Sequence, residues 1–342
     1  MNDIIERDCR DILRLVDIKK AKGKKILITG ANGLLGQYLV AVFSYANKNL
    51  GFNCKINAGG LHGPKAVLSS LMKGDKNISY KKVDLSKPFK GLAGYHYIFH
   101  AAGYAQPAKF VDDPVSTINI NVNATKSLLD GSPKATFVFF SSAEVYGDIP
   151  KEFLPVREDY NGNSPLHNPR SVYAESKRLG EALCASYRRI KGTDIKIARI
   201  SAVYGPGLPK DDTRVMSDFI KKAITLKEIK LLDSGNSIRT YGYISDITAM
   251  ILFIAFHSRD MVYNAGGKDS VSILELAKKI AKYCGANFKV PSQVSKLSHI
   301  GKGPLVVKSD LSKIKKEMKK LKFTSFNEGL ARTIEWSIRN NF

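Results

Sequence analysis

Short apolar runs alternate with helical patterns along the first two thirds of the chain. The run Lys25–Thr29 (KILIT) ends at a glycine and predicts a first central strand, and residues 34–46 then follow a helical pattern. Because parallel neighbours need helical crossovers, this alternation predicts an α/β fold with a doubly wound parallel sheet. Further strands are expected at 52–57, 78–84, 95–103, 136–142 and 195–200, and helices at about 114–130 and 171–190.

The texture changes after about residue 204, where the chain turns to proline and glycine (YGPGLPKDD) and then to a lysine-rich final third. We expect residues 23–204 to form most of the sheet domain and residues 205–342 to form most of a smaller substrate lobe. Residues of about 238–267 resemble further core elements of the sheet domain. Residues 1–22 have apolar positions near helical spacing and predict an N-terminal helical extension.

Composition narrows the class of protein. With 342 residues, 44% of them hydrophobic, the chain can bury a large core. Its longest apolar run, 249–256, is far below the roughly 20 residues of a membrane span, and its N-terminus is charged, so we expect a cytoplasmic protein without a membrane span. Four scattered cysteines and six histidines without ligand spacing predict neither a disulfide framework nor a metal site.

The net charge of +23 suits nucleic acid, anionic lipid or an anionic small substrate. Most of the excess is lysine spread along the chain, as in KIKKEMKKLK (313–322), where no aromatic residues suited to stacking on bases are interleaved. This pattern favours the solvated face of a helix over a nucleic-acid-binding element.

The segment TGANGLLG places Gly30, Gly33 and Gly36 directly after the first strand and at the start of a helix. Glycines there allow a tight turn and close backbone approach, and the helix N-terminus offers N–H groups to a pyrophosphate. The segment therefore predicts the dinucleotide-binding turn of a Rossmann domain.

An acidic residue usually follows about 20 positions later and holds the adenosine ribose. Residues 56–65 (INAGGLHGPK) contain none, and only His62 and Lys65 could meet a 2′-phosphate. The choice between NAD and NADP therefore stays open. Asp84 either bonds the adenine amine or caps a helix.

Tyr173 and Lys177, in YAESK, lie four residues apart and share one face of the predicted helix. Lowering the pKa of a phenol from about 10 to about 7 takes roughly 4 kcal/mol. One ammonium at about 6 Å supplies roughly 3 kcal/mol at an effective dielectric constant near 20. A second positive charge is needed, and an oxidised nicotinamide ring would provide it.

The order of these pieces resembles the extended short-chain dehydrogenase/reductase family, in its NAD-dependent nucleotide-sugar epimerase and dehydratase branch. The resemblance covers about residues 22–342. It rests on ILITGANGLLG, HAAGYAQP, NINVNAT, SSAEVYG, YAESK, ARISAVYGPG, RTYGYISD and SDLSKIKKEM. It implies a nucleotide-sugar substrate, with a UDP-sugar favoured, NAD as cofactor, a homodimer, and no nucleic-acid partner.

The resemblance also implies roles for individual residues. Tyr173 would be the catalytic base, Lys177 would lower its pKa and hold the nicotinamide ribose, and Ser142 would bond the sugar 4-oxygen. Glu144 would be a base at C5 of the sugar; the alternative is a structural residue that caps a turn. Arg239 would grip the diphosphate, with Arg214 assisting. The other implied cofactor-binding positions are Gly30, Asn32, Gly33, Leu34, Leu35, Gly36, Asp84, Leu85, Ala101 and Ala102, and the other substrate-binding positions are Gln106, Ala143 and Val215.

Glu144 favours a lyase that acts through a 4-keto-sugar, either a 4,6-dehydratase or a UDP-glucuronate decarboxylase. The first alternative is a 4-epimerase, in which Glu144 would be idle. The second is a basic scaffold that binds nucleic acid. Three departures from the family pattern leave the reaction open: Ala143 stands where many dehydratases have Asp, residues 307–311 (VKSDL) replace the R-K-P-D-I of decarboxylases, and Ala202 replaces a common Asn.

Overall fold

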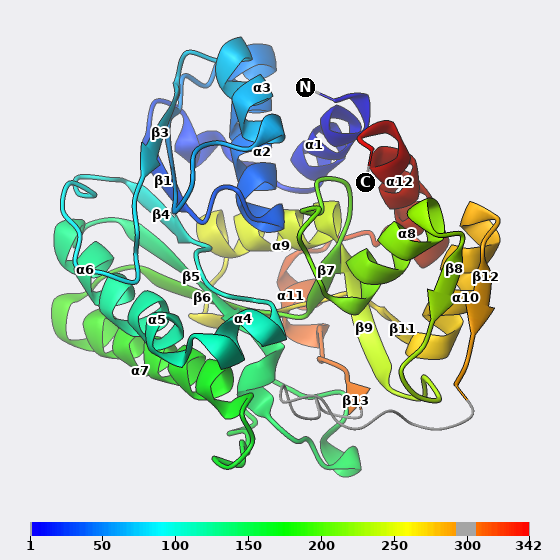
Figure 1. Ribbon diagram of the computed structural model, residues 1–342. Coiled ribbons are helices and arrows are strands. Elements are labelled where there is room, and N and C mark those ends of the chain that lie inside the picture. Colours follow the sequence, from blue (N-terminus) through cyan, green and yellow to red (C-terminus); the bar gives the residue numbers. More distant parts are fainter. Residues whose placement is uncertain (1, 292–305, 342) are drawn as a thin grey trace.

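The computed structural model describes residues 2–291 and 306–341 (Figure 1). Its centre is a seven-stranded sheet of parallel strands in the order β3-β2-β1-β4-β5-β6-β10. This confirms the doubly wound parallel sheet, and the order is that of a Rossmann domain. The strands are β1 (Lys25–Thr29), β2 (Lys55–Gly60), β3 (Ile78–Lys82), β4 (Tyr97–His100), β5 (Thr136–Ser142), β6 (Ile195–Ile200) and β10 (Val262–Ala265).

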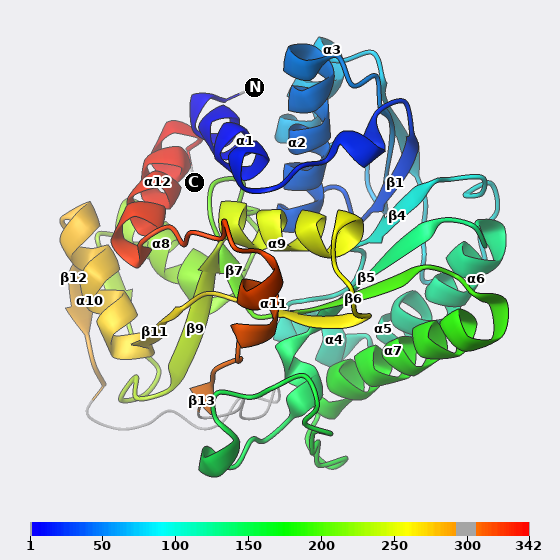
Figure 2. The same ribbon diagram turned by 180° about the vertical axis from the view of Figure 1, so that it is seen from behind.

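Helices cover both faces of this sheet (Figures 1 and 2). One layer contains α2 and α9, with α1 packed on both of them; the other contains α5, α6 and α7. Because both faces are covered, the inner strands are buried almost throughout, which explains their continuous apolar runs. The helices of these layers and the neighbouring α3 and α4 are α1 (Asp3–Leu15), α2 (Leu34–Leu50), α3 (Ala66–Gly74), α4 (Pro107–Asp112), α5 (Pro114–Ile118), α6 (Ala124–Gly131), α7 (Ser171–Lys191) and α9 (Ile244–Phe256).

Several boundaries differ from the sequence-based prediction. Strand β3 ends at Lys82 rather than at residue 84, β4 covers Tyr97–His100 rather than 95–103, and α2 continues to Leu50 rather than ending at residue 46. Strand β2 begins at Lys55 rather than at residue 52 and runs to Gly60, because pairing with β1 sets its register and aligns Thr29 with Gly59. The helix expected at about 114–130 is α5 and α6 joined by a π-helical turn at Asn119–Asn123. That turn packs against α7 and carries Asn121, whose amide donates to Ser176 Oγ at 2.9 Å.

A second, smaller sheet lies beside the carboxyl ends of the main strands. Strand β9 (Ile238–Tyr243) is its centre and pairs with β7, β11 and β13. Residues 238–243 therefore belong to this sheet, whereas α9 and β10, which follow them, belong to the main layers. The other elements of this region are β7 (Ala202–Tyr204), β8 (Glu228–Lys230), β11 (Asp269–Ser272), β12 (Asn287–Lys289), β13 (Val306–Val307), α8 (Val215–Thr225), α10 (Ile273–Cys284), α11 (Ser312–Glu317) and α12 (Phe326–Arg339).

A buried polar cluster joins the two ends of the chain. Asp8 of α1 is fully buried and accepts hydrogen bonds from Tyr38 Oη at 2.7 Å, Tyr243 Oη at 2.8 Å and Arg332 Nη1 at 2.7 Å. These partners come from α2, β9 and α12. The N-terminal helix is thus tied to the main layers, the second sheet and the C-terminal helix through one carboxylate.

Candidate active site

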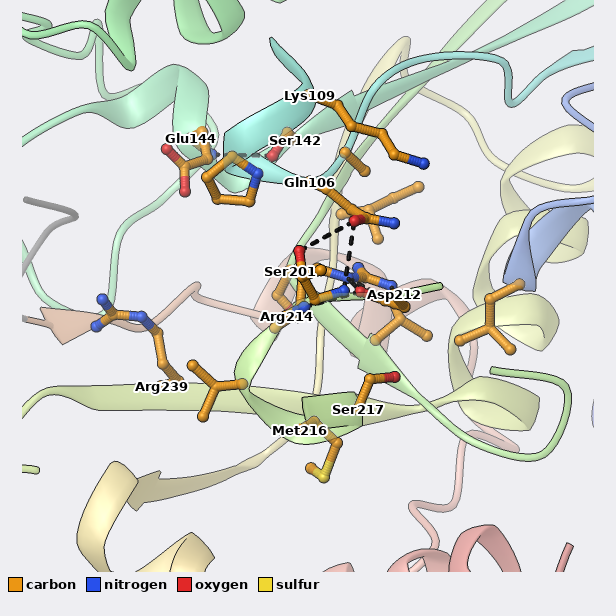
Figure 3. Close-up of a pocket in the computed structure, with 18 of the residues that line it drawn as sticks. Gln106, Lys109, Ser142, Glu144, Ser201, Asp212, Arg214, Met216, Ser217 and Arg239 are labelled. Carbon is orange, nitrogen blue, oxygen red and sulfur yellow. Dashed lines mark hydrogen bonds and ion pairs between the residues drawn. The ribbon is translucent and has the colours of Figure 1, made fainter. Parts of the chain in front are cut away.

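A cavity of about 780 Å³ lies between the carboxyl edge of the main sheet and the second sheet (Figure 3). Its walls come from both sheets. In open α/β sheets this edge, at the point where strand order reverses, is where ligands bind, and here that point lies between β1 and β4. The expected site residues that line the cavity are Gly30, Gly33, Leu34, Leu35, Gly36, Ala101, Ala102, Gln106, Ser142, Ala143, Glu144, Tyr173, Lys177, Arg214, Val215 and Arg239.

The glycine turn between β1 and α2 has the geometry that a pyrophosphate needs. Gly30 adopts a φ of +65°, and a Cβ there would lie 2.7 Å from the backbone of Ala101. A Cβ on Gly36 would lie 2.3 Å from the Gly30 oxygen. The start of α2 can approach the turn this closely only because these residues lack side chains, and the N-terminal N–H groups of α2 would be available to the phosphates of a dinucleotide. The turn therefore fits a dinucleotide.

A buried histidine missed by the sequence analysis braces this turn. His100 Nδ1 lies 2.7 Å from Thr29 Oγ1, and its Nε2 lies 3.1 Å from the Ile120 oxygen. Burial lowers the pKa of His100 to about 3, so the ring is neutral at physiological pH. His100 links the ends of β1 and β4 on either side of the cofactor crevice.

The adenosine end of the site differs from the usual Rossmann arrangement. β2 ends in Gly59 and Gly60, where an acid would ordinarily stand, and a Cβ on Gly60 would lie 2.4 Å from Tyr80 Oη. Tyr80 Oη donates to the His62 oxygen at 2.5 Å and accepts from Asn32 Nδ2 at 2.9 Å. A phenol from β3 thus fills the space beside the missing acid.

Three expected cofactor-binding residues are not among those lining the cavity: Asn32, Asp84 and Leu85. Asn32 binds the loop after β2, accepting from the Lys65 backbone N–H at 2.9 Å. Asp84 Oδ1 accepts from both the N–H and the hydroxyl of Ser86, and the hydroxyl lowers its pKa most. Asp84 therefore caps a turn and not the helix named as the alternative, and its carboxylate remains partly exposed.

The four expected reacting residues converge at one end of the cavity. Ser142 is the last residue of β5, and its hydroxyl accepts from the Glu144 N–H at 3.2 Å, which starts a short 3₁₀-helix (Ala143–Tyr146). Tyr173 and Lys177 lie one turn apart on α7. Lys177 Nζ donates to the Phe140 oxygen at 2.7 Å and lies 5.9 Å from the centre of the Tyr173 ring.

Burial dominates the acid–base properties of this pair. It raises the pKa of Tyr173 to about 12, although hydrogen bonding with Ser142 and the positive charges of Arg214 and Arg170 act in the opposite direction. It lowers the pKa of Lys177 to about 7. The charged residues of the protein alone therefore do not lower the pKa of Tyr173 toward 7. This agrees with the expectation that a further positive charge is needed.

Two residues beside Tyr173 were missed by the sequence analysis. Phe110 of α4 stacks on the Tyr173 ring with centroids 4.7 Å apart and planes at 13°. Arg170, the residue before α7, donates to Glu144 Oε1 at 2.8 Å. Arg170 lies three residues before Tyr173, so the helical spacing was a usable signal for its position; the placement of Phe110 depends on tertiary packing.

The arginines expected to bind phosphates also line the cavity. Arg214 donates to both oxygens of Asp212, at 2.6 Å for the shortest contact, so part of its guanidinium is already engaged (Figure 3). Arg239 lies on β9, and burial lowers its pKa. Gln106 Oε1 accepts from the N–H and hydroxyl of Thr213, and so joins α4 to the loop before α8. Ala143, Ala202 and Val307, which belong to the three departures from the pattern that the sequence resembles, line the cavity.

The loop 205–214 lies against the dinucleotide turn and the helices beside it. Its contacts come from several elements: Gln37 Nε2 donates to the Gly207 oxygen, and Lys65 and Lys109 lie 3.2 and 3.7 Å from Asp211. The loop thus forms a strap between the main domain and the second sheet, at the cofactor end of the cavity.

Comparison with known proteins identifies the family. The sequence profile of the NAD dependent epimerase/dehydratase family matches residues 26–266. The chain belongs to this family. It is 30% identical over 268 residues to UDP-glucuronic acid decarboxylase 5 of Arabidopsis thaliana, covering 78% of this chain and 76% of the relative. It is 27% identical over 315 residues to UDP-glucuronic acid decarboxylase 1 of Xenopus tropicalis, covering 92% and 72%.

Solved structures share the fold of this chain. A dTDP-glucose 4,6-dehydratase from Streptomyces venezuelae, solved with NAD, has a TM-score of 0.80 at 22% identity and covers 93% of this chain and 98% of that one. A UDP-glucuronic acid 4-epimerase from Bacillus cereus, solved with UDP-glucuronic acid and NAD, has a TM-score of 0.75 at 22% identity and covers 93% and 100%. The family is one of NAD-dependent enzymes, so NAD is the cofactor to consider at the glycine turn.

Two expected absences concern only the residues that the structure describes. In residues 2–291 and 306–341, no group of three or more His, Cys, Asp or Glu is placed to hold a metal ion. Within the same residues, no helix combines the length and apolar character needed to cross a membrane.

Proposed function

We propose that this protein is an NAD-dependent nucleotide-sugar lyase that acts through a 4-keto-sugar, with UDP-glucuronate decarboxylation as the favoured reaction. The single observation that carries the proposal is the position of Glu144, in the same cavity wall as Ser142 and beside Tyr173. A lyase needs a group that moves a proton at C5 in addition to the base at the 4-hydroxyl. The curated relatives that are UDP-glucuronic acid decarboxylases support the choice of reaction.

The first step oxidises C4 of the sugar. Tyr173 accepts the proton of the 4-hydroxyl while Ser142 holds that oxygen by a hydrogen bond, and Lys177 stabilises the phenolate. When bound, NAD supplies the chemistry of accepting the hydride from C4 and returning it at the end. The glycine turn, Ala101 and Ala102 would hold the dinucleotide with its reactive end toward Tyr173.

The second step exploits the new carbonyl. A 4-ketone makes a C6 carboxylate part of a β-keto acid. The C5–C6 bond can then break with loss of CO2, and the electron pair of that bond forms an enolate whose negative charge lies on the 4-oxygen. Ser142 and Tyr173 bond this oxygen. Glu144 then passes a proton taken from solvent to C5, which restores the ketone before its reduction. In a 4,6-dehydratase the same carboxylate would instead remove the C5 proton.

Two arginines in the cavity would bind the phosphates of the substrate. Arg239 and Arg214 would bind the diphosphate of a UDP-sugar, and the net charge of +23 favours an anionic substrate.

We also propose a cytoplasmic homodimer formed through the outer face of α7 and α5, where Leu179 is 53% and Val115 66% exposed. Light scattering of the purified protein tests the dimer.

The test of the proposed reaction is incubation with UDP-glucuronate, UDP-glucose and dTDP-glucose, followed by mass spectrometry. Release of CO2 with a UDP-pentose, or loss of water to a 4-keto-6-deoxy sugar, supports a lyase, and Tyr173→Phe should abolish either. Reversible inversion at C4 alone, unaffected by Glu144→Gln, identifies the epimerase alternative. Salt-dependent affinity for RNA or DNA without consumption of any sugar nucleotide identifies the nucleic-acid alternative.

A further inference from the structure

Arg170 has a setting that the proposed reaction does not yet use. Its Nη2 donates to Glu144 Oε1 at 2.8 Å, and its guanidinium carbon lies 5.5 Å from the centre of the Phe110 ring. Its backbone N–H donates to Asn168 Oδ1 at 3.1 Å, which fixes the start of α7. The side chain of Arg170 is only 14% exposed, and both it and Glu144 line the cavity.

The ion pair engages only one oxygen of Glu144. Among the described residues, the Glu144 carboxylate accepts a hydrogen bond from Arg170 alone, through Oε1. Glu144 is 30% exposed and lines the cavity, so its carboxylate is not sealed in the core. A charge-assisted hydrogen bond at a largely buried site restricts the rotamers of both partners. One oxygen is fixed and the other is available to a ligand.

The pair also resolves an electrostatic conflict. A carboxylate beside Tyr173 opposes formation of the phenolate, and the Glu144 charge indeed raises the pKa of Tyr173. The Arg170 charge lowers the pKa of the same phenol. Glu144 can therefore stand next to the catalytic base without suppressing it, because its counter-charge is held 2.8 Å away.

We propose that Arg170 is a positioning residue that fixes one oxygen of Glu144 and so aims the other at C5 of the keto-sugar. The inference rests on the proposed function, since it assigns Arg170 a part in the C5 step of that reaction. Arg170 touches neither C4 nor C5 in this role. It acts through Glu144 and differs in this from an arginine that binds a substrate carboxylate directly.

The two roles predict different results for Arg170→Lys, which keeps the positive charge near Tyr173 but loses the planar fork. Positioning predicts that sugar oxidation, followed as reduced dinucleotide in a single turnover, stays within a few-fold of wild type. It predicts that solvent deuterium incorporation at C5 and product formation slow by roughly ten- to a hundredfold. The double variant Arg170→Lys with Glu144→Gln should be no slower at C5 than Glu144→Gln alone.

The matched control is Arg157→Lys, which alters an exposed arginine that is paired with Asp159 at 3.5 Å and does not line the cavity. It should leave the ratio of oxidation to C5 exchange unchanged. The role of Arg170 would be overturned if the two substitutions in the double variant slowed the C5 step by the product of their separate effects. An increase in KM confined to sugars that bear a carboxylate would also overturn it. If wild-type protein forms no reduced dinucleotide with any sugar nucleotide, the proposed function itself falls, and this inference with it.

Discussion

Phe110 lies flat against Tyr173, with ring centroids 4.7 Å apart and ring planes at 13°. Phe110 is 1% exposed and comes from α4, whereas Tyr173 comes from α7. The stack therefore fixes the phenol relative to the opposite wall of the cavity. Neither partner is near the other in the sequence, so only the tertiary fold creates the contact.

We expect Phe110→Leu to lower kcat by about three- to tenfold, which corresponds to the roughly 0.5–1.5 kcal/mol of an aromatic pair. KM for the sugar nucleotide should change little, because Phe110 orients the base rather than the phosphates. Phe153→Leu is the control, since Phe153 packs against Tyr160 with ring centroids 5.1 Å apart and planes tilted by 41°, and it is 50% exposed. Steady-state kinetics on both variants measure this difference. An equal loss of kcat in the two variants would refute the role of the stack.

Gly36→Ala tests whether the dinucleotide turn is as tight as its glycines indicate. The added methyl would meet the Gly30 oxygen at 2.3 Å and Ala31 Cα at 2.8 Å, both of them backbone atoms that cannot move independently. We expect a loss of roughly 1–3 kcal/mol in stability together with loss of NAD binding. Thermal unfolding and calorimetric titration with NAD measure the two effects.

Gly63→Ala provides the comparison, because a Cβ at Gly63 would meet nothing within 4 Å. This variant should bind NAD and unfold like wild type. If Gly36→Ala also binds NAD normally, the turn has more room than its contacts indicate, and the fit to a pyrophosphate is wrong.

The main sheet could be predicted from the sequence because its inner strands are buried on both faces. Strands β1, β5 and β6 have the bounds expected from their apolar runs. Strand β2 does not, since its last residues are glycines without an apolar signal and its register comes from pairing with β1. The short strands of the second sheet, such as β7 and β13, carry too few residues to show a period.

The residues of the candidate site likewise include some that could be predicted from the sequence and some that could not. Ser142, Tyr173 and Lys177 could be placed together because each stands at the end of a buried strand or on one face of a helix. Tyr80 and Phe110 could not, since they reach the site across strand and helix neighbours that no local pattern encodes. Side chains supplied by tertiary contacts are the part that required a structure.

Asp211→Asn tests whether the loop 205–214 retains the dinucleotide. Asp211 pairs with Lys65, which precedes α3, and with Lys109, which lies on α4. Each exposed pair contributes about 0.2–1 kcal/mol, so NAD should leave about two- to fivefold faster at low salt. The difference should shrink as salt rises, because screening already weakens these pairs in wild type.

Stopped-flow measurement of NAD release at two ionic strengths makes this comparison. Asp159→Asn is the control, since Asp159 forms an exposed pair with Arg157 at 3.5 Å outside the cavity wall. An identical release rate in Asp211→Asn and wild type at low salt would show that the ion pairs do not hold the strap.

The buried ammonium of Lys177, beside Tyr173, should lower the free energy of unfolding of the protein. Its pKa is about 7 in the folded protein because of burial, against about 10.4 in an unfolded chain. Below about pH 7 both states carry the proton, and the folded state bears the whole cost of a buried ammonium. As pH rises from about 7 to about 10.4, the folded protein binds fewer protons than the unfolded one, so that cost declines.

Lys177→Met should therefore be inactive yet more stable than wild type, and its advantage should be larger at about pH 6 than at about pH 9 by roughly 2–3 kcal/mol. Urea unfolding of dinucleotide-free protein at the two pH values measures the difference. Lys191→Met, at the exposed end of the same helix, should show no such change with pH, since its ammonium is 48% exposed. A stability gap for Lys177→Met that is equal at both pH values would mean that the Lys177 ammonium is well solvated in the folded protein. Its electrostatic role beside the phenol would then be much weaker than its burial implies.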